Sequence, residues 1–292
     1  MSPAPPSGSA IGVDIGGTNV RAARVDRDGR LSGLLKVRTD SQPDPLELVS
    51  GLCRRLLDDD VEAIGIGIPG RLDGDGATVL SSGYVELAGQ RLGDIIGGRV
   101  GRPVVLDNDA HMALLAELRL GAATDAGDVV MFTVGTGIGG AVALDREVLR
   151  GRGNAGQLGH LTLDPQGPEC NCGRRGCSEV LASGTALGRL MEEAGLPPGT
   201  TAESLLERRA DDTVAAGVLC HWARSWRDAI DTVTAVLDPD LVLLGGGLGS
   251  AAVAALEACA PSVSPWFGCP VVPARLGDDA GVIGAGLRAL ER

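Results

Sequence analysis

Aromatic residues are scarce in this chain of 292 residues, which has three Trp, two Phe and one Tyr. Proteins that bind single-stranded nucleic acid stack the bases on aromatic side chains, so the composition argues against that class. The formal net charge of -12 argues against a general nucleic-acid surface, because such a surface needs clustered Lys and Arg. We therefore expect no nucleic-acid partner, and a core built from aliphatic side chains.

Long apolar runs are also missing. None approaches the roughly 18 residues of a membrane span, and residues 1–9 lack the charged start and apolar segment of a signal peptide. We therefore expect a cytoplasmic protein with no membrane contact and a disordered leader over residues 1–9. The length, with 44% hydrophobic residues, allows one large or two medium domains, and we favour two.

Common nucleotide-binding signatures are absent or incomplete. The chain has no P-loop and no protein-kinase motif set. Gly135, Gly137 and Gly140 have the spacing of a dinucleotide fingerprint, but a β-like stretch follows them where a helix is required. Any nucleotide must therefore be bound by another fold.

Apolar patterning predicts strands that alternate with helices. Strand patterns cover residues 10–14, 20–26, 31–38, 63–68, 104–106, 128–134, 140–144 and 241–244. Helical patterns cover residues 45–57, 110–120, 184–194, 202–209, 211–237 and 279–290. The alternation predicts an α/β fold with largely parallel central pairings, and the recurring pattern of strand, glycine turn and strand predicts a duplicated architecture.

The segment over residues 154–179 places one histidine ahead of three cysteines in a glycine-rich stretch. One imidazole and three thiolates suit a tetrahedral Zn²⁺ site, so we predict a structural zinc at His160, Cys170, Cys172 and Cys177. Ordinary buried cysteines beside an unrelated histidine are the alternative, because the C-x-C-x4-C spacing is unusual. A disulfide framework would need an exported chain, and a C-x-x-C redox pair is absent.

Two glycine turns can approach an anion closely. They are Gly16-Gly17-Thr18 and Gly135-Thr136-Gly137, in which small residues expose backbone N–H groups. Asp14 precedes the first turn and can hold Mg²⁺ through water. A tight hairpin needs glycine for conformational reasons alone, and this is the alternative for either turn taken singly.

Six motifs together resemble the ROK family of sugar kinases and repressors, within the actin-like ATPase superfamily, from Ala10 to Arg292. They lie at residues 14–21, 69–70, 108–110, 135–140, 155–160 and 170–179. The resemblance implies an α/β, actin-like and ribonuclease H-like fold of two lobes, each a mixed sheet flanked by helices. We expect an N-terminal lobe over residues 10–108, joined by the closing helix 279–292, and a C-terminal lobe over residues 109–278 that contains the zinc segment.

The resemblance implies a glucokinase-like enzyme that transfers the γ-phosphoryl group of ATP to the 6-OH of glucose or a glucose derivative. Asp109 would be the catalytic base, while Mg²⁺ and backbone donors neutralise the phosphates; without the resemblance, an N-cap role would suit Asp109. The implied sugar-binding residues are Asn108, Asp109, Gln157, His160, Glu179 and Gly70, with His160 serving zinc and sugar through its two ring nitrogens. The implied ATP-binding residues are Asp14, Gly16, Gly17, Thr18, Asn19, Gly135, Thr136, Gly137, Gly245, Gly246 and Gly247.

One position departs from the family pattern, because its kinases usually carry Glu where this chain has Gln157. Glutamine both donates and accepts hydrogen bonds, so kanosamine, N-acetylmannosamine or N-acetylglucosamine is an alternative acceptor. A sugar-sensing ROK regulator without catalysis is an alternative of another class. Such regulators carry a helix-turn-helix domain ahead of the first glycine turn, whereas thirteen residues precede Asp14 here. The resemblance also implies a homodimer or a dimer of dimers.

The remaining histidines, tryptophans and cysteines need no functional role. We expect His111 and His221 at helix surfaces, and Trp222 and Trp226 in the core or in a dimer contact. The other cysteines are expected to be reduced and buried: Cys53, Cys220, Cys259 and Cys269.

Overall fold

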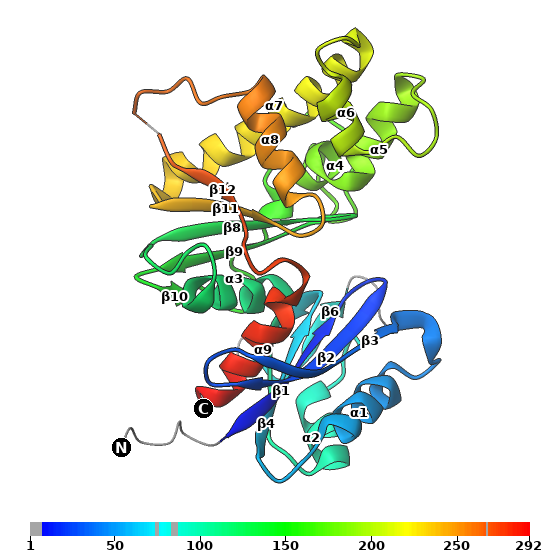
Figure 1. Cartoon of the computed structure of the whole chain (residues 1–292), viewed down its shortest axis with the longest axis vertical. Helices are drawn as coiled ribbons and strands as arrows, with labels where there is room; N and C mark the ends of the chain where they lie inside the picture. The colour runs from blue at the N-terminus through cyan, green and yellow to red at the C-terminus, as the bar shows by residue number, and fades with distance from the viewer. Residues whose placement is uncertain (1–7, 74–75, 83–86, 267) are drawn as a thin grey trace. The chain divides into compact units, whose positions relative to one another are not determined.

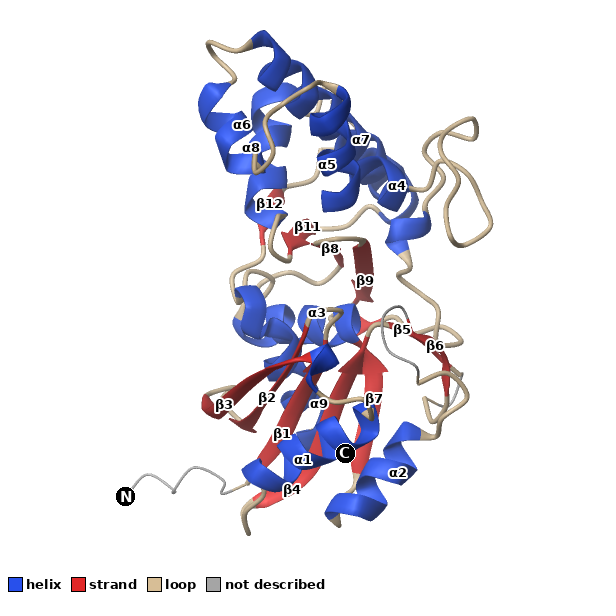
Figure 2. Ribbon diagram, turned by 90° about the vertical axis from the view of Figure 1, so that its right-hand side faces the viewer, coloured by secondary structure: helices blue, strands red, loops and turns tan. Residues whose placement is uncertain are grey.

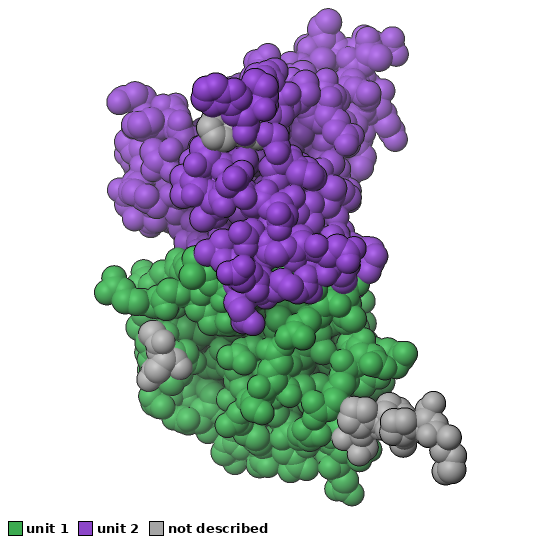
Figure 3. Space-filling view, turned by 90° about the vertical axis from the view of Figure 1, so that its left-hand side faces the viewer, with its two compact units in different colours: residues 1–121, 148–155, 278–292 green, residues 122–147, 156–277 purple. Residues whose placement is uncertain are grey.

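The computed structural model describes residues 8–73, 76–82, 87–266 and 268–292. Two compact units divide the chain (Figure 3): the first holds residues up to 121, 148–155 and 278–292, and the second holds residues 122–147 and 156–277. Each unit contains a five-stranded sheet with helices packed on it (Figure 1), which confirms the α/β class. Residues 109–121, which we expected in the C-terminal lobe, pack with the first unit. Most of the expected leader lies outside the described residues, and the first strand begins at Ser9.

The sheet of the first unit has the strand order β3-β2-β1-β4-β7. Its first three strands form an antiparallel meander, and β4 and β7 extend the sheet with parallel pairings to β1 and to each other. Parallel pairing brings the carboxyl ends of β1, β4 and β7 to one edge. The strands are β1 (Ser9–Ile15), β2 (Asn19–Asp26), β3 (Leu31–Arg38), β4 (Val61–Ile68) and β7 (Val104–Asn108), and a separate hairpin comprises β5 (Gly70–Leu72) and β6 (Val79–Ser82).

Four helices belong to the first unit: α1 (Pro45–Leu56), α2 (Leu92–Val100), α3 (Asp109–Leu120) and α9 (Ala280–Leu290). The start of α1 follows from its sequence, because the Asp44 side chain accepts from the Leu46 N–H and Pro45 occupies the first turn. Figure 2 shows α1 and α2 on the near face of the sheet. The other face is covered by α9, which also packs on α3.

Glycines allow α9 to approach the sheet until backbone meets backbone. A Cβ added at Gly65 in β4 would lie 1.8 Å from the Ala285 carbonyl oxygen, and one at Gly12 in β1 would lie 2.0 Å from the Val282 carbonyl oxygen. On its other side α9 meets α3, where a Cβ at Gly284 would lie 1.7 Å from a carbonyl oxygen. These positions therefore exclude every residue with a side chain unless the helix moves.

The second unit repeats the topology of the first, because its sheet has the order β10-β9-β8-β11-β12. Strands β8 and β9 form an antiparallel hairpin, and β11 and β12 extend the sheet with parallel pairings. The predicted duplication is confirmed at the level of strand order. The strands are β8 (Val129–Val134), β9 (Ile138–Leu144), β10 (Glu147–Val148), β11 (Leu241–Gly245) and β12 (Val271–Pro273).

The helices of the second unit pack around an apolar core that contains three of the chain's six aromatic side chains. The ring of Trp226 makes edge-to-face contacts with Phe132 and Trp222, at centroid distances of 5.5 and 6.4 Å. Both tryptophans are fully buried, and Trp222 donates its Nε1–H to the Ala182 carbonyl at 2.7 Å. Their predicted core role is confirmed. The helices are α4 (Ser178–Ala182), α5 (Gly184–Glu193), α6 (Ala202–Arg208), α7 (Thr213–Leu237) and α8 (Gly249–Cys259).

A disulfide joins Cys220 of α7 to Cys259 of α8. The expectation that these two cysteines are reduced is therefore wrong, because the neighbouring helices bring residues 39 positions apart into bonding distance. Cys53 is a buried free thiol as expected, and Cys269 is half-buried. No helix among the described residues combines the length and the apolar character needed to cross a bilayer.

Gly65→Ala should destabilise the protein by at least about 3 kcal/mol, because the methyl group would meet a backbone carbonyl that cannot rotate away. Gly98→Ala in α2 is the matched control, since a Cβ there has no neighbour within 4 Å. That variant should be neutral or more stable by up to about 1 kcal/mol. Urea unfolding curves of both variants measure the difference, and equal stabilities would contradict the close approach of α9.

Candidate active site

Two carboxyl groups meet at the carboxyl edge of the first sheet. Asp14 is the penultimate residue of β1, and Asp109 begins α3 directly after β7. Strand β4 lies between them and contributes Gly67, which pairs with Asp14 on one side. A Cβ at Gly67 would lie 3.4 Å from the Cα of Asp109, so the glycine lets α3 start close to the sheet.

Both carboxyl groups bind their protons more tightly than an exposed aspartate does. Burial, together with the negative charge of Asp109, raises the pKa of Asp14 to about 7, against the opposing charge of Arg21. Burial raises the pKa of Asp109 to about 6, although the Ala110 N–H works in the other direction. Carboxyl groups with raised pKa values in one place are typical of sites that transfer protons or bind cations.

Asn108 connects α3 to the loop after β4. Its Oδ1 accepts from the Ala110 N–H at 3.0 Å, which makes Asn108 the N-cap of α3 and leaves Asp109 as the first helical residue. The alternative N-cap role for Asp109 is therefore wrong. The Asn108 Nδ2 donates to the Gly70 carbonyl at 3.0 Å. One amide group thus holds two predicted sugar-binding positions and the start of the helix together.

The first glycine turn closes β1 onto β2. The Gly16 N–H donates to the Asn19 carbonyl at 2.9 Å, and the Thr39 hydroxyl donates to the Gly16 carbonyl at 2.8 Å. Gly17 and Thr18 are exposed at the tip of the turn. The turn is therefore held by Thr39, which directly follows β3, and its tip is exposed to solvent.

In the second unit, two glycine segments lie at the ends of neighbouring parallel strands. Residues 135–137 follow β8, and residues 245–247 begin at the last residue of β11. The Leu248 N–H donates to the Val134 carbonyl at 3.1 Å, and β8 and β11 pair in parallel. The start of α5 also packs on the first segment, since the Thr185 hydroxyl donates to the Thr136 carbonyl at 2.8 Å. Carboxyl ends of parallel strands are the usual ligand-binding edge of α/β sheets.

The segment that carries Gln157 and His160 packs on β9, also in the second unit. Residues 158–160 form a short 3₁₀ turn. The Glu179 carboxylate accepts from the Ile138 N–H at 3.0 Å, and the Ser178 hydroxyl donates to the Leu158 carbonyl at 2.6 Å. The start of α4 therefore braces this turn and the beginning of β9 together. Gln157, His160 and Glu179 thus share the second unit, whereas Gly70, Asn108 and Asp109 belong to the first.

One histidine and three cysteines converge in the second unit as the spacing predicted. The ligand atoms of His160, Cys170, Cys172 and Cys177 all lie within 4.8 Å of one another. The Sγ of Cys170 is 3.7 Å from His160 Nδ1, and the Sγ atoms of Cys172 and Cys177 are 3.6 Å apart. Zinc–sulfur bonds of about 2.3 Å in a tetrahedron place two sulfurs about 3.8 Å apart, so the cluster has the dimensions of a zinc site.

The thiols of this cluster differ in acidity. The Arg174 backbone N–H, with its guanidinium, lowers the pKa of Cys172 to about 7, whereas burial raises the pKa of Cys177. A thiolate at Cys172 is therefore accessible at neutral pH. The thiolate is the form that binds metal, so the lowered pKa of Cys172 favours metal binding at neutral pH.

The chain from residue 10 onward matches a known family over its whole length. The family model described as the ROK family covers residues 10–292. The chain belongs to the ROK family. The predicted family and the predicted actin-like fold with two mixed sheets are confirmed, since solved ROK structures share the fold.

Relatives of this ROK protein include kinases for different sugars. It is 30% identical over 305 residues to a glucokinase of Streptomyces coelicolor, with 95% of this chain and 96% of the relative covered. It is 33% identical over 296 residues to an N-acetylmannosamine kinase of Yersinia pseudotuberculosis, with 97% and 98% covered. A crystal structure of a Streptomyces griseus ROK family glucokinase in complex with glucose and AMPPNP matches with a TM-score of 0.84 and 32% identity, covering 98% of this chain and 100% of that one.

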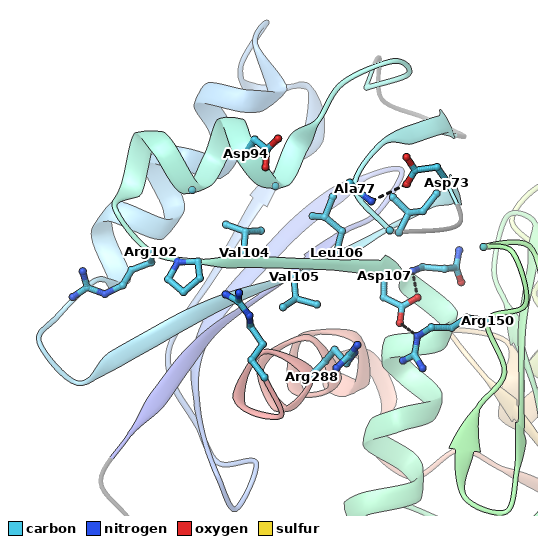
Figure 4. A pocket seen from close by; sticks show the side chains of 18 of the residues that line it. Asp73, Ala77, Asp94, Arg102, Val104, Val105, Leu106, Asp107, Arg150 and Arg288 are labelled. Atoms are coloured by element: carbon cyan, nitrogen blue, oxygen red, sulfur yellow. Dashed lines mark hydrogen bonds and ion pairs between the residues drawn. The ribbon is translucent and has the colours of Figure 1, made fainter.

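A cluster of side chains around Asp107 in this ROK protein was not predicted from the sequence. His111 was expected at the surface but is only 2% exposed, because its ring lies between Asp107 and the Ala155 carbonyl. Arg150 donates to the other oxygen of Asp107 at 2.6 Å, as Figure 4 shows beside a cavity of about 670 Å³ in the first unit. The cavity lining includes Asn108. The sequence pattern that could have predicted this cluster is the spacing of Asp107 and His111, which lie four residues apart across the start of a helix.

Asp14→Asn should raise the melting temperature of the metal-free protein at pH 8 by roughly 5 °C, as a gain of 1–2 kcal/mol would. The folded protein keeps the Asp14 proton up to about pH 7, against a reference value of 3.8, so the carboxyl lowers stability increasingly as pH rises between these values. The gain should therefore vanish near pH 4. Calorimetry at several pH values tests this, with exposed Asp59→Asn as the control, and parallel curves for parent and variant would contradict it.

Proposed function

We propose that this ROK protein is an ATP-dependent kinase that phosphorylates the 6-OH of glucose or a close derivative. The observation that carries the proposal is the pair of carboxyl groups, Asp14 and Asp109, at one sheet edge with raised pKa values. With a pKa of about 6, Asp109 is ionised at neutral pH and still basic enough to accept the proton of the attacking hydroxyl. The glucokinase relatives support the same reaction.

The glycine segments would bind ATP through their backbone N–H groups. In the second unit, residues 135–137 and 245–247 lie at the edge where α/β sheets bind ligands, and in the first unit the turn from Gly16 to Asn19 has its tip exposed. Asp14 fits a role in holding Mg²⁺, because a nearby cation would favour the ionised form that burial and the charge of Asp109 disfavour. When bound, Mg²⁺ supplies positive charge to the phosphates.

Asn108, His160 and Glu179 would bind the sugar, and each is held by contacts within its own unit. Asn108 acts partly by positioning, because its amide already holds Gly70 and the start of α3. His160 turns its Nδ1 toward Cys170, so its Nε2 is the nitrogen that would meet a sugar hydroxyl. Glu179, fixed through Ile138, would accept a hydrogen bond from another hydroxyl.

The four-residue cluster would hold a structural Zn²⁺. Its donor set and its spacing suit a closed tetrahedral site, and the His160 backbone carbonyl is fixed by Arg174 at 2.6 Å. Metal at this place would orient the imidazole that meets the sugar. The metal would therefore affect sugar binding without touching the sugar.

An amino sugar is the second candidate acceptor. The N-acetylmannosamine kinase relative favours it, and so does Gln157, whose amide can donate a hydrogen bond as well as accept one. A carboxylate at this position would only accept. For this second candidate, the acceptor should differ from glucose at a ring position whose substituent can accept a hydrogen bond from the Gln157 amide.

The first test is ADP release from Mg·ATP with glucose, mannose, glucosamine, kanosamine, N-acetylglucosamine and N-acetylmannosamine. Turnover should favour one hexose, and Asp109→Asn should lower kcat by about 10²–10⁴-fold with sugar binding retained, because the base is lost. In the parent, kcat/KM should fall below about pH 6 as Asp109 is protonated. Asp59→Asn controls for a change of charge. A kcat of Asp109→Asn within tenfold of the parent would remove the base role, and no turnover with any sugar would refute the kinase.

Cys172→Ser should lower the zinc content from one ion per chain to well below one and reduce the melting temperature with it, because a tetrahedral site loses a charged ligand. Elemental analysis of the purified protein measures the metal. Cys269→Ser is the matched control, since this half-buried cysteine lies outside the cluster. Unchanged zinc in Cys172→Ser would defeat the coordination assignment.

A further inference from the structure

Three side chains form a hydrogen-bonded cluster beside the proposed base: Asp107 and His111, which are buried, and Arg150, whose side chain is 35% exposed. Asp107 is the penultimate residue of β7 and is 5% exposed. Its Oδ1 lies 2.8 Å from His111 Nδ1 and accepts from the Asn108 N–H at 2.8 Å, and its Oδ2 accepts from Arg150 Nε at 2.6 Å. Both oxygens of this carboxylate therefore face donors of the same unit, and the cluster holds the residue before Asp109.

The His111 ring bridges two acceptors. Its Nδ1 faces the Asp107 carboxylate, and its Nε2 lies 3.0 Å from the Ala155 carbonyl oxygen. A neutral imidazole carries one N–H, so only the protonated ring donates to both acceptors. Burial alone would raise the pKa of Asp107, but the hydrogen bonds and charges of His111 and Arg150 hold it below its usual value. Both neighbours therefore favour the ionised form of Asp107.

The same cluster clamps a short excursion of the chain at both of its ends. Residues 148–155 belong to the first unit, although the segments before and after them belong to the second. Arg150 fixes the beginning of the excursion on Asp107, and Ala155 fixes its end on His111. The Gly153 N–H donates to the Arg150 carbonyl at 2.8 Å, which closes the turn between the two anchors. Gln157 follows two residues after the second anchor.

We propose that His111 is a positioning residue for the sugar. By holding the Ala155 carbonyl, it fixes the backbone from which Gln157 extends, and through Asp107 the same ring braces the turn that carries Asn108 and Asp109. The ring therefore braces both the start of α3 and the excursion that leads to Gln157 through one buried side chain. This inference rests on the proposed kinase function. It assigns no contact between His111 and either substrate.

Two substitutions of His111 separate positioning from general stability. The asparagine amide reaches the place of Nδ1, so His111→Asn keeps the bond to Asp107 and loses the bond to Ala155. The glutamine amide reaches the place of Nε2, so His111→Gln keeps the bond to Ala155 and loses the bond to Asp107. Each variant removes one hydrogen bond from the same buried ring, so their melting temperatures should fall by similar amounts.

The expected result is a rise of about tenfold in the sugar KM of His111→Asn, with a rise below about threefold in His111→Gln. The ATP KM of both should stay within about twofold of the parent, because no residue of the cluster belongs to a glycine turn. His221→Asn, on the exposed face of α7, is the control and should leave all constants unchanged. Equal sugar KM values for the two His111 variants would overturn the inference.

A measurement without substrate keeps the inference separate from the proposed function. Hydrogen exchange of the backbone amides over residues 150–157 should be faster in His111→Asn than in His111→Gln and the parent, because only the first variant releases Ala155. Equal exchange in the two variants would show that Ala155 is not held by the ring, whatever the enzyme does. Absence of hexose turnover in the parent, with exchange as expected, would instead refute the kinase proposal and leave the clamp in place.

Discussion

The close approach of α9 to the first sheet is the constraint on which the candidate site depends. Backbone contacts at Gly12 and Gly65 hold β1 and β4 against the helix, and Gly284 brings the helix against α3. Two of these elements, β1 and α3, carry Asp14 and Asp109 at their ends. The first turn of α9 even reaches the carboxyl of Asp14, since a Cβ at Gly281 would lie 2.8 Å from its Cγ. A side chain at any of these glycines would displace the elements that set the two carboxyl groups side by side.

That arrangement opposes stability and therefore indicates function. Burial raises the pKa values of both carboxyl groups, and the charge of Asp109 raises that of Asp14 further, so the pair lowers the free energy of unfolding at neutral pH. Neighbouring charges reduce the penalty only in part: Arg21 acts on Asp14 but also binds Asp278, and His111 acts on Asp109. Unfavourable burial of carboxyl groups, in a fold whose other features favour stability, is typical of active sites.

Sequence patterns predicted those parts of the fold that depend on local chemistry. The glycine turn at residues 135–137 and the zinc-type cluster follow from residue type and spacing, and both lie where they were expected. Helix α8 was missed because it is rich in alanine and apolar on all sides, which leaves no amphipathic period to detect. The burial of His111 and the Cys220–Cys259 bond were missed because each depends on a contact between elements that are distant in sequence.

The two units share a topology, but only the first supplies the pair of carboxyl groups with raised pKa values, Asp14 and Asp109. Both units place a glycine turn after their first strand, and the penultimate residue of that strand is Asp14 in the first unit and Thr133 in the second. The second unit instead elaborates its sheet with the segment of residues 156–179 and with glycines after β11. One copy of the architecture thus retains the acid chemistry, while the other provides backbone donors and the metal-type cluster. The excursion of residues 148–155, clamped by Asp107 and His111, is the point at which the chain leaves the second copy to be fixed on the first.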